Sequence, residues 1–173
     1  PRTGGLLALR RPGDRSNRLS QLLAVRTTRP APAGGAAWES VEERAAYGRM
    51  QAEAVARVKT ADGRDCIESR GELLDADGRA TGSFTQRFTL AAGLPLAVID
   101  LTVSLSAARA GPLGEHHVAC RFAWHENDDA DLLRSLQTQA IVTTRSRFTA
   151  PHFILVRGAA AGDVAILTGG LAW

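Results

Sequence analysis

The chain has 173 residues, 45% of them hydrophobic and 23% charged, and a net charge of +3. A chain of this length and composition can bury a core large enough to fold without a disulfide or a structural metal. It holds no run of about eighteen apolar residues, so no membrane-spanning segment is expected. Lys59 is the only lysine among the 21 basic residues, a bias typical of a GC-rich bacterial genome. The arginines are scattered, so a nucleic-acid partner is not expected either.

The N-terminus reads Pro1-Arg2-Thr3-Gly4-Gly5, without an initiator Met or the apolar core of a signal peptide. We therefore expect a fragment of a longer polypeptide, and a cytoplasmic location is favoured. The two cysteines, Cys66 and Cys120, lie in apolar strand-like runs and are expected to be buried and reduced. Their spacing to each other and to the histidines is not that of a zinc site.

Alternating apolar and polar residues predict an all-β chain. Along 96–105, Ile99 and Leu101 point to one face and Asp100 to the other, and along 83–90 Gln86 shares the apolar face with Phe84. This pattern is typical of antiparallel sheets with one side exposed to water. In chain order, strands are expected at 6–9, 21–25, 47–59, 66–74, 81–90, 96–105, 116–124, 141–145, 153–157 and 164–168.

Turn signals fit between these strands. The pairs Asp62-Gly63 and Asp77-Gly78 favour the positive φ that tight hairpin turns require. Short strands joined by glycine-rich turns indicate an antiparallel β-sandwich, here a single domain over residues 1–173.

Three segments do not fit a strand pattern cleanly. Residues 28–38 are rich in Pro, Ala and Gly and are expected to form a flexible connector. Residues 39–58 contain many helix-forming side chains, so helix and strand both stay open, with a strand preferred over 47–59. Residues 126–136 begin with Asn127-Asp128-Asp129, which could cap a short helix through Leu132 and Leu133.

The four histidines have the right chemistry for a metal site but not the right spacing. His116 and His117 are adjacent and would face opposite sides of a strand, and His125 lies far beyond His117 on the same strand parity. No metal site is expected.

Carboxylates for acid–base chemistry are not paired either. Most aspartates lie in turns, where Asp is favoured because it bonds the backbone. Asp100 lies within a strand and is expected to face solvent or to pair with an arginine across the sheet. Nucleophile-elbow, phosphate-binding and dinucleotide-binding motifs do not occur, so no catalytic residue is assigned.

Aromatic and basic residues around strand ends are the candidates for ligand binding. A Trp or His beside an arginine can stack on a sugar ring while the guanidinium binds hydroxyl groups. For Trp124 a core position competes with this role, because it shares a strand face with Phe122. The candidate substrate-binding residues are Arg121, Trp124, His125, Arg134 and His152.

Several stretches, taken in order, resemble the C-terminal all-β region of the α-mannosidases of glycoside hydrolase family 38. The resemblance covers nearly the whole chain, and the order of the stretches carries it, because each alone is weak. The stretches are 3–9 (TGGLLAL), 17–21 (NRLSQ), 67–73 (IESRGEL), 84–88 (FTQRF), 96–105 (LAVIDLTVSL), 121–124 (RFAW), 150–153 (APHF) and 167–171 (LTGGL).

The resemblance implies a galactose-mutarotase-like β-sandwich, in truncated form, from a large retaining glycosidase. The nucleophilic Asp and the zinc ligands of that family lie mainly upstream, and no stretch here matches them. The chain would then scaffold an upstream zinc-containing catalytic domain of the same polypeptide and contribute loops to a carbohydrate substrate site. It would have no activity of its own. With strands missing at its ends, the isolated chain would expose unpaired edges and aggregate.

Two other functions compete with this one. An autonomous carbohydrate-binding or protein-interaction β-sandwich needs no attached enzyme. A mutarotase-like epimerase would need a His and a Glu converging on one sugar, either His117 with Glu126 or His152 with Glu115. The sequence supports neither pair.

Overall fold

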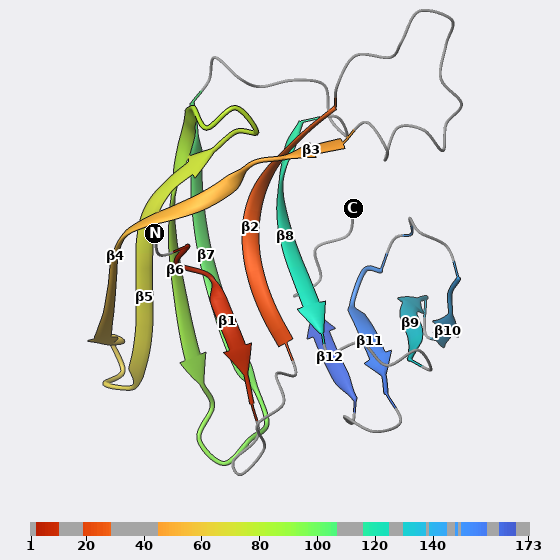
Figure 1. The fold of residues 1–173 in the computed structure, drawn as a ribbon. Helices are drawn as coiled ribbons and strands as arrows, with labels where there is room; N and C mark the ends of the chain where they lie inside the picture. Colours follow the sequence, from red (N-terminus) through yellow and green to blue (C-terminus); the bar gives the residue numbers. More distant parts are fainter. Residues whose placement is uncertain are drawn as a thin grey trace, which may run out of the picture. The chain divides into compact units, whose positions relative to one another are not determined.

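The protein is described by a computed structural model, which covers residues 3–10, 19–28, 45–106, 116–124, 130–137, 139–144, 148, 150–158 and 163–168. Within these residues every regular element is a strand and none is a helix, and the strands form three sheets of four strands each (Figure 1). The strand pairs with a defined register are all antiparallel. The prediction of an all-β, antiparallel chain is therefore confirmed.

The strand order in the sheets is β1-β2-β3 with β8 also paired to β2, then β4-β5-β6-β7, and then β10-β9-β11-β12. The strands are β1 (Leu6–Leu9), β2 (Leu19–Thr28), β3 (Ala45–Tyr47), β4 (Arg49–Lys59), β5 (Asp65–Leu74), β6 (Ala80–Leu90), β7 (Ala97–Leu105), β8 (His117–Trp124), β9 (Asp131–Leu136), β10 (Gln139–Val142), β11 (Phe153–Arg157) and β12 (Val164–Leu167).

The chain divides into two compact units. The first comprises residues Pro1–Leu6 and Gln21–Phe122, and the second comprises Leu7–Ser20 and Ala123–Trp173. The first unit holds the whole β4–β7 sheet, and the second holds the whole β9–β12 sheet.

The β4–β7 sheet is built from three successive hairpins. Gly63 and Gly78 have φ of 82° and 83°, as the Asp-Gly pairs predict. In the second turn the Asp75 carboxylate accepts hydrogen bonds from the backbone N–H groups of Asp77 and Arg79, at 3.0 and 2.8 Å. These local bonds stabilise the turn that joins β5 to β6.

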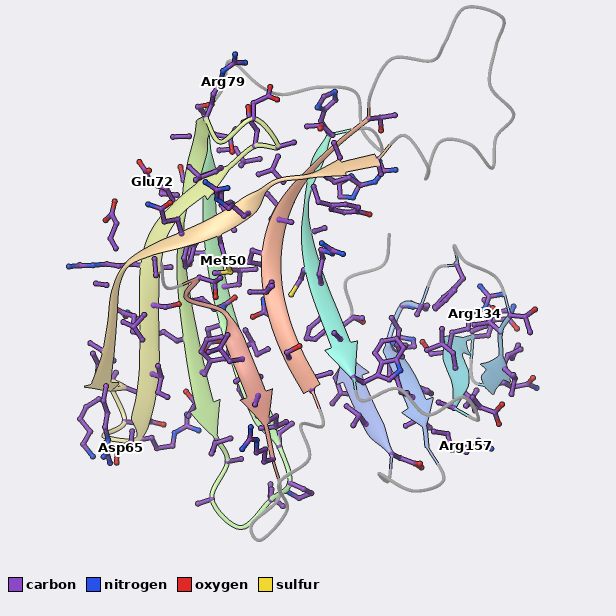
Figure 2. The ribbon with its side chains drawn as sticks, viewed as in Figure 1. Met50, Asp65, Glu72, Arg79, Arg134 and Arg157 are labelled. Carbon is purple, nitrogen blue, oxygen red and sulfur yellow. The ribbon has the colours of Figure 1, made fainter. Side chains whose placement is uncertain are left out.

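The apolar core of the first unit lies between this sheet and β2. It consists of Leu23 and Val25 from β2, Met50 from β4 (labelled in Figure 2), Leu73 from β5 and Phe84 from β6. The Leu23 side chain is 1% exposed and that of Leu73 is 0% exposed. The alternation seen in the sequence therefore turns one apolar face of each strand toward the other sheet.

A buried polar pair crosses the same core. The side-chain amides of Gln21 (β2) and Gln86 (β6) exchange two hydrogen bonds, both 3.0 Å long, and the residues are 1% and 0% exposed. The Gln21 amide nitrogen also donates to the Cys120 sulfur at 3.2 Å. A fully bonded buried amide pair of this kind favours one alignment of two sheets, because any shift leaves polar atoms unpaired.

The second unit has a smaller core around its own sheet. Leu133 and Val156 are 4% and 5% exposed, and Ser135 is 2% exposed. The Ser135 hydroxyl accepts hydrogen bonds from the backbone N–H groups of His152 and Phe153, at 2.9 and 3.1 Å. This side chain therefore fixes the start of β11 against β9.

Two ambiguous segments, 39–58 and 126–136, form strands in their described parts, which begin at residues 45 and 130. The strand preferred over 47–59 is confirmed, as β3 and β4 with a break at Gly48. The helix considered for 126–136 is wrong for its described part, which is β9. Leu133 and Ser135 alternate inward there, and β9 pairs with strands on both sides, which outweighs a local helix cap. Residues 126–129 lie outside the described part, as does the connector expected at 28–38 apart from Thr28.

Other expectations are confirmed in part. Both cysteines are free, and Cys66 is buried as expected, but Cys120 is exposed as a residue. Its thiol lies on the inward face of β8, next to Gln21, where burial raises its pKa. Asp100 faces solvent on β7 directly opposite Arg87 of β6, as predicted.

Candidate functional site

The five residues predicted to bind substrate do not gather within one unit. Arg121 belongs to the first unit, whereas Trp124, Arg134 and His152 belong to the second. His125 lies outside the described residues. The set predicted from sequence is therefore not one site inside either unit.

Arg121 is already engaged with an aromatic ring. Its guanidinium carbon lies 4.4 Å from the centre of the Tyr47 ring, a cation–π contact between β8 and β3. Arg121 is an exposed residue, as alternation along β8 predicts.

The candidates in the second unit have separate environments. Trp124 is 37% exposed, so it does not take the core position that its strand parity favours. Arg134 lies 5.8 Å from the centre of the Phe148 ring. The backbone of His152 bonds to Ser135 and to Thr168, and its side chain is exposed.

A groove on the outward face of the β4–β7 sheet was not predicted. It is shallow, with a volume of about 570 Å³, and several strands line it. Glu72, Ser83 and Ser104 form one row across β5, β6 and β7, because Glu72 is paired with Ser83 and Ser83 with Ser104 (Glu72 is labelled in Figure 2). The polar lining residues are Glu53, Arg70, Glu72, Thr81, Ser83, Thr85, Ser104 and Ser106.

A β-bulge supplies one of these side chains. The register of β4 on β5 shifts between Ala52 and Ala54, so Glu53 is an extra residue without a cross-strand partner. Bulges commonly re-aim a side chain next to a functional site. Here Glu53 joins the lining of the groove while Ala52 still packs against the core.

The charges of the groove are mixed. Two carboxylates, Glu53 and Glu72, and one guanidinium, Arg70, share the lining with five hydroxyl groups. Beside the groove, the Glu68 carboxylate binds the Arg87 guanidinium at 2.7 Å, and this contact raises the pKa of Arg87. The outward face therefore combines acceptors and donors without a dominant charge.

Other kinds of site are not seen in the described ranges. They contain no cluster of three or more metal-binding side chains. They also contain no helix that is long and apolar enough to cross a membrane.

Comparisons with known protein families, with curated proteins and with solved structures find no match to this chain.

The sequence indicates which residues face outward in these strands, because they are the polar residues at every second position. What the sequence does not give is the register that aligns them, or the bulge that adds Glu53. The signal available was the run of charged and hydroxyl residues at every second position of three consecutive strands.

Proposed function

We propose that the chain is the non-catalytic β-sandwich part of an α-mannosidase-like glycoside hydrolase, and that it holds carbohydrate in the groove of the β4–β7 sheet. The upstream catalytic domain of that enzyme would carry the zinc ion and the nucleophile. The sandwich would be a truncated form of the galactose-mutarotase-like type.

The groove is the observation that carries this proposal. Carboxylates, guanidinium groups and hydroxyl groups can bind the hydroxyl groups of a sugar, because they supply both acceptors and donors of hydrogen bonds. Glu53, Glu72 and Arg70 supply charged partners, whose hydrogen bonds are stronger than neutral ones. Ser83 and Ser104 extend the same row.

The family resemblance points to the same strands. The stretch 67–73 supplies Arg70 and Glu72, and the stretch 84–88 supplies Thr85. Segments singled out by the resemblance therefore also contribute to the groove. An autonomous carbohydrate-binding module would use this groove in the same way, and it differs only in having no catalytic domain attached.

Titration calorimetry of the 173-residue chain with α-linked manno-oligosaccharides tests the proposal. Binding should be saturable, and Glu72→Gln should weaken it by about tenfold, because one hydrogen bond to a charged group is lost. Glu68→Gln is the matched control, since Glu68 lies on the same strand and face but outside the groove. Equal effects of the two variants, or no binding by the folded chain, would refute a carbohydrate site here.

The proposed lack of catalytic activity in this chain is tested by a separate assay. The isolated chain should release no product from a chromogenic α-mannoside. Turnover that persists after purification to homogeneity would contradict it.

A further inference from the structure

One edge of the β4–β7 sheet is open. In the part of the chain that the structure describes, β7 pairs with β6 on one side and with no strand on the other. The Ser106 N–H donates to the Thr81 carbonyl, and the Leu96 carbonyl accepts from Ala91 N–H. Residues alternate in an antiparallel ladder, so the even-numbered residues between Leu96 and Ser106 also bond toward β6. The odd-numbered residues from Ala97 to Leu105 then direct their N–H and C=O groups outward.

The sequence protects the opposite edge of this sheet but not this one. The outer strand β4 has a bulge at Glu53 and carries Arg57 and Lys59, which are features that discourage strand pairing. The nine residues of β7, AVIDLTVSL, contain no proline, no basic residue and no bulge. Leu101 and Leu105 on this strand are 40% and 50% exposed. An edge of this kind is a template for another strand.

We propose that two copies of this chain pair through β7, antiparallel and centred on Leu101. In this register the outward backbone groups of the odd-numbered residues face each other. Leu101 lies opposite Leu101 of the second copy, and Ile99 lies opposite Val103 of the second copy. Apolar side chains therefore meet apolar side chains across the new interface.

Charge disfavours the adjacent register centred on Asp100, and the other adjacent register, centred on Thr102, would pair only residues 99–105 of β7. With the pairing centred on Leu101, Asp100 lies opposite Thr102 of the second copy, a hydroxyl that can donate to the carboxylate. A register centred on Asp100 would set two carboxylates directly opposite each other, which is unfavourable. Each Asp100 also keeps Arg87 opposite it within its own chain.

The pairing joins two four-stranded sheets into one continuous sheet of eight strands. Side chains directly opposite each other in an antiparallel pair lie on the same face. The grooves of both copies would then open on one side of the joined sheet. This inference goes beyond the proposed function and does not depend on the ligand of the groove.

Disulfide trapping of the full 173-residue chain tests the register. Val98 and Ser104 of the second copy are opposite each other in the proposed pairing, where neighbouring strands bring the Cα atoms to about 4.5 Å. The double variant Val98→Cys/Ser104→Cys should form a 98–104 disulfide under mild oxidation, identified by peptide mass spectrometry. Within one chain the two positions are roughly 20 Å apart along the strand, so the bond must be intermolecular. Val98→Cys/Thr102→Cys is the matched control, which would cross-link only in the register centred on Asp100.

Sedimentation velocity over a dilution series measures the association itself. The unmodified chain should show a monomer–dimer equilibrium. Leu101→Lys should raise its dissociation constant by at least about tenfold, because it sets two ammonium groups opposite each other. Thr102→Lys places the same charge opposite Asp100 of the second copy and should retain the dimer. A monomer throughout, open-ended aggregates without the 98–104 disulfide, or a disulfide in the control instead would overturn the proposal.

Discussion

The buried amide pair between β2 and β6 provides the sharpest stability prediction. Gln86→Leu removes both hydrogen bonds that the Gln21 amide receives and donates at 3.0 Å. Gln21 is 1% exposed, so its carbonyl oxygen would stay buried without a partner, and its nitrogen would keep only the weak bond to the Cys120 sulfur. Leaving such a group unpaired costs about 2 kcal/mol of the free energy of unfolding.

Urea denaturation followed by circular dichroism measures this cost. With a dependence of about 2 kcal/mol per molar urea, the midpoint of Gln86→Leu should fall by about 1 M. The double variant Gln21→Leu/Gln86→Leu removes both polar groups and should lose clearly less than the sum of the two single variants. Additive losses would refute the reasoning, because they would mean that the two amides do not depend on each other.

Three further predictions follow from local geometry. The pKa of Asp65 is held at about 2, below its ordinary 3.8, mainly by hydrogen bonds from the basic side chains beside it. These contacts therefore stabilise the fold above pH 3.8, and they are lost as the pH falls toward 2. Between pH 3.8 and 2, the midpoint of urea unfolding should therefore fall less for Asp65→Asn than for the unmodified chain. Gly71→Ala should destabilise the fold by about 2 kcal/mol, because a Cβ there collides with the backbone oxygen of Gln51, and an unchanged melting temperature would contradict this. Cys120 should react with iodoacetamide more slowly than a free thiol at pH 8, since burial raises its pKa, and equal rates in mass spectrometry would argue against it.

The strands were largely predictable because their signal is local. The alternation along 83–90 and 96–105 depends only on which residues face the core, and the structure has the strands β6 and β7 there. The Asp-Gly turns carry their own conformational preference, which Gly63 and Gly78 adopt. The failure at 126–136 has the opposite cause, because neighbouring strands β10 and β11 decide the state of β9.

The candidate site was less predictable because it depends on distant residues. The sequence places Gln86 on an apolar face, but its partner Gln21 is 65 residues away. The groove needs Glu72, Ser83 and Ser104 in one row, and that row depends on the registers of two strand pairs. Alternation alone gives the face of each residue but not its neighbours.

The bulge in β4 also bears on how this strand can tolerate changes in length. In a regular strand, deleting one residue reverses the facing of every side chain beyond it. Glu53 has no cross-strand partner, so its deletion would leave Ala52 opposite Gly71 and Ala54 opposite Arg70, as they are now. Shortening the chain at this one position would thus preserve the packing of both halves of β4 and take a carboxylate out of the groove, which separates the requirements of folding from those of ligand recognition.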